Sequence, residues 1–253
     1  ARLAHRPTRP GGEQKPQGDG SLDRVKKAGK LVFATDSTYP PMEYEENSKI
    51  LGFDMDVAAE IAKRLGVKFE AVSAKWDGLL PGLKEKKYEA VISTMNVTDE
   101  RKKEVEFSAY TALDQVFVVR PDSKPVTKLE ELAGKVVAVQ VGTTSEDMAK
   151  GVKGVKEIKS FDQFDTTFVE LRNKKADVIV IDEPVGLYFA RKDPKTFVVS
   201  GQAAQAMPVG IAIRKEDKEL REAIDKAVEA MKKDGKFKEI SMNWFGKDLT
   251  NAK

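Results

Sequence analysis

Two segments of the chain repeat one pattern, and this repetition constrains the fold more than any other feature. LKEKKYEAVIS begins at Leu83 and LRNKKADVIVI begins at Leu171, 88 residues later, and the two match almost position for position. In each segment a helix pattern ends at a Lys-Lys turn and an apolar strand pattern follows. Polar residues come directly after the strand, Ser93 and Thr94 in the first copy and Asp182 in the second.

A second pair of similar segments occurs in the same order. LVFATDS from Leu31 and VVAVQVGTTS from Val136 are both strand patterns that lead into polar residues before a helix. Two such pairs predict two similar α/β lobes. Because ligands of open α/β sheets bind beyond the carboxyl ends of the strands, we expect the two lobes to share one cleft.

Each half of the chain alternates strand and helix patterns. In the first half we expect strands at residues 31–35, 67–72 and 88–93, and helices at 57–65 and 79–86. In the second half we expect strands at 136–139 and 178–181 and a helix at 145–150. This order predicts mainly parallel sheets with helices on their faces.

The chain has two candidate crossings between the lobes, residues 115–120 and about 201–210. An amphipathic stripe from Leu220 to Met231 follows the second crossing and predicts a helix that returns to the first lobe. We therefore expect a first lobe of residues 21–117 plus 208–253 and a second lobe of 118–207. Residues 1–20 lack apolar periodicity and are expected to form a disordered tail or tether.

Composition excludes several classes of protein. The 44 basic and 41 acidic side chains of the 253 residues leave a net charge of +3, too balanced to predict binding to nucleic acid or to an anionic membrane. The chain has no Cys and one His, His5, so disulfides, thiolate chemistry, a His-based triad and a His-rich metal site are not expected. No cofactor or metal is predicted. No run of eighteen apolar residues occurs, and no transmembrane helix or signal peptide is expected.

Polar residues at the strand ends admit two interpretations each. Ser93, Thr94 and Asn96 follow an apolar strand, with Arg101 five residues further on. They form either an ordinary strand–loop–helix junction or a set of groups delivered to a ligand, whose negative end Arg101 would hold. Read alone, the charge run around Arg101 is more typical of a solvated helix face.

The segment Val141-Gly142-Thr143-Thr144-Ser145 likewise admits two interpretations. Gly and hydroxyls at the start of a helix suit a carboxylate or a phosphate, although a simple helix cap accounts for them as well. No GxxxxGK[ST] or GxGxxG pattern surrounds them, which argues against a nucleotide.

Asp182 follows four apolar residues, and an unpaired carboxylate at the end of a buried strand is costly. Asp182 therefore either meets a cation such as a ligand α-ammonium, or caps a helix, or joins an internal salt bridge. Asp36, Tyr39 and Trp76 also lie at predicted strand ends or turns. The two aromatic rings could stack on a ligand or could belong to the core.

Taken together, these segments resemble the polar amino-acid-binding proteins of bacterial ABC importers, the family 3 extracellular solute-binding proteins. The resemblance spans nearly all of residues 21–247. The motifs that carry it are TDSTYPPMEY, LGFDMDVAAEIAKRLG, WDGLLPGLKEKKYEAVIS, NVTDERKKEVEFS, VGTTSEDMAK, IDEP and DGKFKEISMNWFG. It implies the periplasmic binding protein-like II fold, or Venus flytrap, in which two α/β lobes joined by two hinge strands close on one free amino acid.

The resemblance also implies a role for each candidate residue. Arg101 would pair with the ligand α-carboxylate, Thr143 and Thr144 would hold the same group, and Asp182 would take the α-ammonium. The segment from Ser93 through Thr94 and Met95 would assist Asp182. The ligand side chain would contact Asp36, Tyr39, Trp76 and Gln140. Asn96 departs from the Ser or Thr usual in the family, and FSAY replaces the commoner FSDPY.

The resulting prediction is a non-enzymatic receptor that delivers an L-amino acid to an ABC transporter permease. Asp36 beside two aromatics favours a cationic or an amide side chain, and we place arginine or lysine ahead of glutamine. We expect a monomer in the periplasm or outside the cell, tethered to the membrane in a full-length precursor. The alternatives are a neutral polar amino acid as ligand, a dehydratase on the same fold with Glu183 or Asp182 as general acid, and a sensory module.

Overall fold

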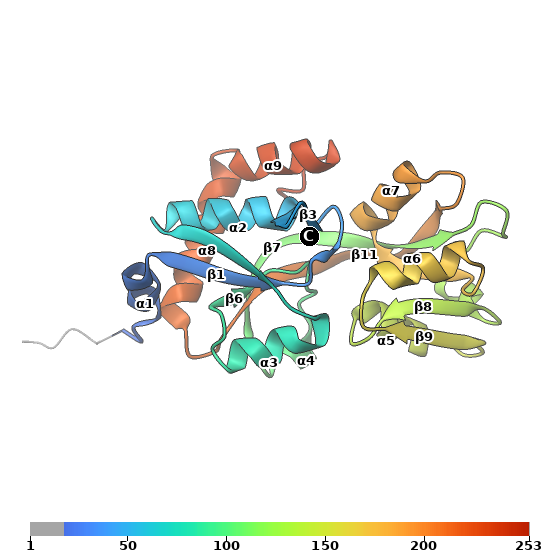
Figure 1. Ribbon diagram of the computed structural model, residues 1–253, viewed down its shortest axis with the longest axis horizontal. Coiled ribbons are helices and arrows are strands. Elements are labelled where there is room, and N and C mark those ends of the chain that lie inside the picture. Colours follow the sequence, from blue (N-terminus) through green and yellow to red (C-terminus); the bar gives the residue numbers. More distant parts are fainter. Residues whose placement is uncertain (1–17, 253) are drawn as a thin grey trace, which may run out of the picture.

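The computed structural model of the protein describes residues 18–252 and has two α/β lobes (Figure 1). Within that range eight strands form one sheet. In spatial order they are β5 (Lys68–Ser73), β1 (Lys30–Thr35), β6 (Ala90–Val91), β11 (Val198–Ile213), β7 (Glu106–Val119), β10 (Val178–Asp182), β8 (Val136–Gln140) and β9 (Glu157–Phe161). The prediction of two lobes with mainly parallel strands and flanking helices is confirmed.

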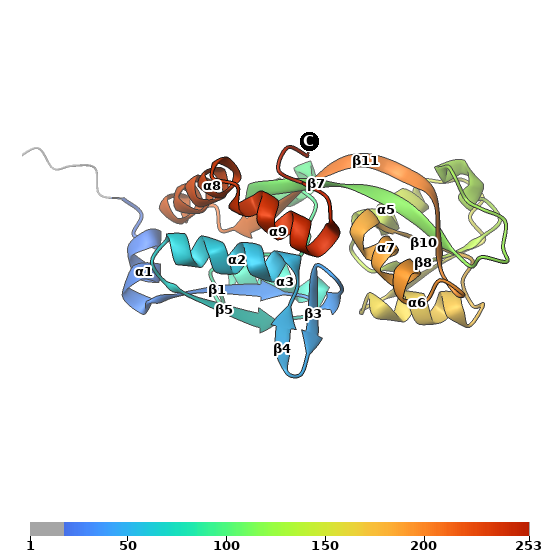
Figure 2. The ribbon, with the colours of Figure 1, turned by 90° about the horizontal axis from the view of Figure 1, so that it is seen from above.

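Helices cover the sheet in both lobes (Figures 1 and 2). The α-helices are α1 (Ser21–Ala28), α2 (Phe53–Arg64), α3 (Leu79–Lys84), α4 (Asp99–Lys102), α5 (Thr144–Lys150), α6 (Asp165–Arg172), α7 (Glu183–Lys192), α8 (Lys218–Lys233) and α9 (Lys236–Phe245). Two short 3₁₀ turns are η1 (Trp76–Gly78) and η2 (Leu129–Leu132). A small antiparallel sheet of β2 (Thr38–Tyr39), β3 (Glu43–Glu46) and β4 (Lys49–Leu51) projects from the first lobe.

In the first lobe β1 lies between β5 and β6, parallel to both. Successive residues of a strand point to opposite faces, so Phe33 packs in the cluster with Ile61 of α2, whereas Ala34 packs with Leu79 of α3. The predicted strand at 88–93 pairs along only two residues. Thr94 has a φ of 51°, which turns the chain away from the strand direction.

The second lobe repeats this arrangement. β10 runs parallel to β8, and β8 to β9. Val137 and Val139 face one cluster with Ala149 of α5, and Ala138 faces the other with Phe168 of α6. The repeat seen in the sequence therefore corresponds to the same packing of helices on both faces of the parallel strands.

The two lobes are joined by β7 and β11, which run antiparallel side by side through both (Figure 2). The predicted crossings at 115–120 and 201–210 lie within these longer strands. α8 and α9 then pack against the first lobe, in a cluster that contains Ile224, Met231 and Phe237. The division after residue 117 and before residue 208 stays a prediction, because both positions lie inside continuous strands.

Of the predicted tail, residues 1–17, including His5, lie outside the described residues. Among residues 18–252 no helix is long and apolar enough to cross a membrane. The same residues contain no group of three or more His, Cys, Asp or Glu side chains that could hold a metal ion.

Candidate functional site

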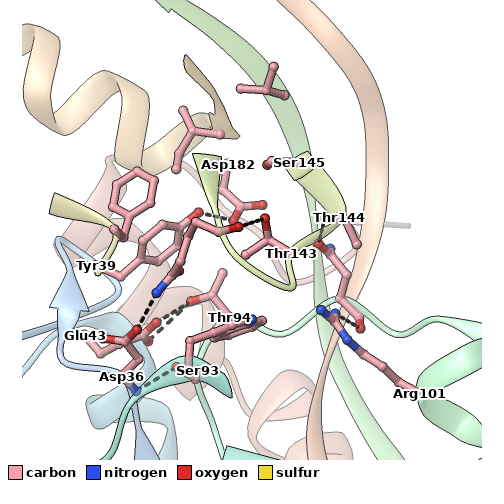
Figure 3. Close-up of a pocket in the computed structure, with 16 residues that line it drawn as sticks. Asp36, Tyr39, Glu43, Ser93, Thr94, Arg101, Thr143, Thr144, Ser145 and Asp182 are labelled. Carbon is pink, nitrogen blue, oxygen red and sulfur yellow. Dashed lines mark hydrogen bonds between the residues drawn. The ribbon is translucent and has the colours of Figure 1, made fainter. Parts of the chain in front are cut away.

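A cavity lies between the lobes, where the carboxyl ends of β1, β6, β8 and β10 meet (Figure 3). The cavity volume is about 40 Å³, and about 490 Å³ of empty space is counted when its mouth and the open solvent there are included. The residues that line it are Asp36, Tyr39, Glu43, Trp76, Ser93, Thr94, Asn96, Arg101, Gln140, Thr143, Thr144, Ser145, Phe164, Val180, Ile181 and Asp182.

Arg101 supplies the positive charge of the cavity. The hydroxyl of Thr98 caps α4 by accepting from the Arg101 N–H at 3.2 Å, which fixes where the side chain starts. The guanidinium donates from Nη1 to the carbonyl of Asn96 at 2.8 Å and from Nη2 to the carbonyl of Gly142 at 3.1 Å. It also lies over the ring of Trp76, 5.4 Å from the centroid. Burial lowers the pKa of Arg101, and no carboxylate of the described residues forms an ion pair with it, so an anionic ligand group would complete the site.

Thr144 lies opposite Arg101 on the second lobe. Its hydroxyl donates to Oδ1 of Asn96 at 2.8 Å, so the two lobes touch at this point. Thr143 precedes it as the N-cap of α5, where its hydroxyl accepts from the Glu146 N–H and donates to the carbonyl of Gln140 at 2.8 Å. Hydroxyls and a guanidinium thus surround one end of the cavity.

Asp182 supplies negative charge from the end of β10. Its carboxylate is only 5% exposed and accepts hydrogen bonds from the Tyr39 hydroxyl and the Gln115 amide. Burial raises the pKa of Asp182 to about 6, because the two hydrogen bonds offset only part of the cost of desolvation. No Lys, Arg or His of the described residues pairs with it, and it therefore suits a cationic ligand group.

Asp36 follows β1 and bridges the lobes. Oδ2 accepts from Nε2 of Gln140 at 2.7 Å, and Oδ1 accepts from the Thr38 hydroxyl at 2.7 Å. Ser93 braces it, since its Oγ accepts from the Asp36 N–H at 3.0 Å (Figure 3). Burial raises the pKa of Asp36.

A match to a known protein family identifies the kind of protein to which this site belongs. The model of the bacterial extracellular solute-binding proteins, family 3, matches residues 31–247. The chain belongs to this family. The L-cystine-binding protein TcyJ of Escherichia coli (strain K12) is 34% identical over 92% of this chain and 88% of TcyJ. The arginine-binding extracellular protein ArtP of Bacillus subtilis (strain 168) is 31% identical over 89% of this chain and 91% of its own.

Solved structures of similar proteins agree with the family assignment. An ancestral arginine-binding protein bound to arginine is 41% identical, with a TM-score of 0.83 over 86% of this chain and 99% of that one. An ancestral arginine-binding protein bound to glutamine is also 41% identical, with a TM-score of 0.82 over 87% of this chain and 99% of that one. An ancestral amino acid-binding protein described as a precursor of cyclohexadienyl dehydratase is 38% identical, with a TM-score of 0.82 over 89% and 99%.

All the residues predicted for the family 3 ligand site line this cavity except Met95. The side chain of Met95 is 2% exposed and packs in the apolar cluster with Leu79 and Leu83, because Thr94 turns the chain there and directs the next side chain into the core. Asn96 occupies the position usual for Ser or Thr and connects the lobes through Thr144. The role of each residue toward a ligand stays a prediction.

Five lining residues were not predicted, namely Glu43, Ser145, Phe164, Val180 and Ile181. Val180 and Ile181 belong to the strand that carries Asp182, and Ser145 follows Thr144, so their proximity could have been inferred. Glu43 had no such signal, because Glu45 and Glu46 on the same strand are exposed. Phe164 lies before α6, and its ring meets that of Tyr39 edge-on with centroids 4.7 Å apart.

Proposed function

We propose that this protein is a receptor that closes around one free L-amino acid with a cationic side chain, arginine ahead of lysine, and delivers it to an ABC importer. The observation that carries the proposal is that Arg101 and Asp182 face the same cavity, each without an ion-pair partner among the described residues. Buried charges are costly unless paired. An α-amino acid supplies a carboxylate for one and an ammonium for the other.

The other residues that line the cavity favour a ligand with a cationic side chain. Asp36 and Glu43 both line the cavity and carry carboxyl groups, while the lysines and the other arginines of the described residues lie elsewhere. Tyr39, Trp76 and Phe164 add aromatic faces, on which a guanidinium or an alkyl chain can stack. The names of relatives such as ArtP, an arginine-binding protein, support this ligand class.

A neutral polar amino acid such as glutamine is the second candidate. Gln140 already donates to Asp36 inside the cavity, which shows that an amide fits beside this carboxylate. The similar structure of an ancestral arginine-binding protein bound to glutamine supports the same alternative.

We assign no catalytic role to the site. Glu183, a candidate general acid for a dehydratase, is absent from the cavity lining and lies within 3.7 Å of the Lys247 ammonium. Asp182 would be occupied by the ligand ammonium and so could not act as an acid. Turnover of prephenate or arogenate by the purified protein would contradict this assignment.

The names of relatives support a partner and a location for this protein. Their names describe periplasmic, extracellular and ABC transporter proteins, and we propose a periplasmic or extracellular monomer that docks on a permease.

Calorimetric titration of refolded, ligand-stripped protein with the L-amino acids tests the proposal. We expect arginine or lysine to bind most tightly. Arg101→Ala should weaken binding by roughly 100-fold or more, since two charge-assisted hydrogen bonds to the α-carboxylate are lost. Arg172→Ala, a half-exposed arginine outside the cavity, is the control and should bind as the unmodified protein does. Full affinity in Arg101→Ala would contradict the proposal that Arg101 holds the ligand α-carboxylate.

A further inference from the structure

Two buried carboxyl groups share one hydroxyl partner at the wall of the cavity. Glu43 of β3 lines the cavity, and Asp54 of α2 lies behind it; both are 0% exposed. Their carboxyl groups converge on one hydroxyl, that of Thr94. Two ionised carboxylates this close in a buried site repel each other, which favours one proton held between them.

The surrounding donors lead to the same conclusion. Asp54 accepts from the Thr94 N–H at 2.8 Å and from the Tyr110 hydroxyl at 2.8 Å. The Thr94 hydroxyl lies 2.8 Å from Oδ2 of Asp54 and 3.1 Å from Oε1 of Glu43. A hydroxyl has one proton and can serve only one of them. The donors converge on Asp54, which leaves Glu43 as the group that carries the shared proton.

No positive charge compensates this pair. The titratable groups that face it are Asp36 after β1, Tyr39 of β2, Tyr110 of β7 and Asp182 of β10. All are acidic or phenolic, and no Lys, Arg or His of residues 18–252 forms an ion pair with Glu43 or Asp54. Burial and the neighbouring Asp54 raise the pKa of Glu43 well above its usual value.

We propose that Glu43 and Asp54 hold one proton between them in the unliganded protein, and that a cationic ligand side chain displaces this proton when it docks against Glu43. The inference rests on the proposed function. The O–H bond of Glu43 breaks, its electron pair stays on the carboxylate, and the proton passes to buffer. The ligand cation replaces one positive charge with another, so the buried region keeps its net charge.

The shared proton makes the selectivity of the cleft depend on pH. A neutral amide leaves the proton in place, and the Glu43 O–H can donate to its carbonyl. A cation requires the proton to leave, and its affinity therefore rises with pH by up to about tenfold per unit while the pair remains protonated. The affinity for an amide side chain lacks this contribution.

The test measures proton release directly. L-arginine is titrated into ligand-stripped protein at about pH 7 in phosphate and in MOPS, two buffers with different heats of ionisation. Asp182 is about nine-tenths ionised there and contributes only about a tenth of a proton. We expect a buffer-dependent heat that corresponds to most of one proton released per arginine.

Matched variants locate the proton. Glu43→Gln should release only the roughly one tenth of a proton that comes from Asp182. Glu45→Gln changes an exposed glutamate on the same strand and should release as much as the unmodified protein. If Glu43→Gln binds arginine too weakly to titrate, Asp54→Asn keeps Glu43 and removes its partner, and proton release should fall.

The possible failures differ from one another. This inference is overturned if arginine binds with the same heat in both buffers, or if Glu43→Gln and Asp54→Asn both release as much proton as the unmodified protein. The proposed receptor function would still stand in either case. Binding of glutamine but neither arginine nor lysine overturns the inference and leaves an amino-acid receptor for neutral ligands. Binding of no amino acid overturns the proposed function together with the inference.

Discussion

The carboxyl group of Asp182 should make binding of every α-amino acid depend on pH. Asp182 is the group proposed to meet the ligand ammonium, and burial raises its pKa from 3.8 to about 6. Since the folded, unliganded site holds its proton more tightly than an exposed aspartate does, Asp182 is neutral below about pH 6 and ionised above it. A neutral carboxyl attracts an ammonium far less than a carboxylate does.

We therefore predict that affinity for every α-amino acid falls as the pH drops through about 6, by up to tenfold per unit below it. Because arginine and glutamine both carry the α-ammonium, both should lose affinity as Asp182 takes up its proton. The effect proposed at Glu43 differs, since it applies only to ligands with a cationic side chain. Titration calorimetry across about pH 4.5–8 measures it. Asp182→Asn should bind weakly at all pH values, with no inflection near 6. Constant affinity down to about pH 4.5 would contradict the assignment of Asp182.

Several of the predicted residues that line the cavity lie at or just after the ends of strands. Ser93, Gln140 and Asp182 end apolar runs, and the carboxyl ends of parallel strands meet at one edge of a sheet. Glu43 escaped prediction because it lies on a hairpin strand whose burial depends on the contact with α2. Met95 packs in the core and does not line the cavity, because the left-handed turn at Thr94 decides which way its side chain points, and no local pattern reveals that turn.

At the scale of elements, β7 and β11 are the joint between the lobes, and their pairing is irregular. The register shifts between Ala204 and Met207, opposite Leu113 to Gln115. Ala206 has a φ of 29°, and its N–H is bound by Oδ1 of Asp114 at 2.7 Å instead of by a strand partner. The sequence located this crossing but underestimated its length, because Gly201 and Pro208 interrupt the strand pattern. The irregular segment between them is where we expect the hinge to bend.

Asp114→Ala should loosen this segment. Loss of the bond to the Ala206 N–H is expected to cost about 1 kcal/mol of unfolding free energy, a typical value for one hydrogen bond. Amide hydrogen exchange at Ala206 should become faster, while exchange in β1 and β8 stays as before. Asp114→Asn retains an acceptor and serves as the matched control. Equal rates of amide hydrogen exchange at Ala206 in both variants would show that Asp114 does not hold this irregular segment in place.

At the scale of the whole molecule, the two lobes contact each other directly through the residues of the cavity. Asp36 meets Gln140, Tyr39 meets Asp182, and Asn96 meets Thr144. The carbonyl of Gly142 accepts from both Trp76 and Arg101, each at 3.1 Å. The groups proposed to hold the ligand therefore also hold the lobes together, and weakening closure should shorten the time for which a ligand stays bound.

Trp76→Phe separates closure from ligand contact. Phenylalanine keeps an aromatic face for the ligand and for Arg101 but removes the Nε1–H that reaches Gly142 on the other lobe. The loss of one hydrogen bond, about 1 kcal/mol, should speed ligand dissociation roughly five-fold in a stopped-flow displacement experiment. Small-angle scattering of the unliganded variant should give a larger radius of gyration, because the open form gains population.

Trp244→Phe is the matched control for this experiment. The Nε1–H of Trp244 also donates to a partner, Oδ2 of Asp56 at 2.7 Å, but both residues belong to the first lobe and neither lines the cavity. This variant should dissociate its ligand at the rate of the unmodified protein, with an unchanged radius of gyration. If the two variants behave alike, the bond from Trp76 to Gly142 does not contribute to closure. The aromatic ring alone would then account for the part that Trp76 plays in binding.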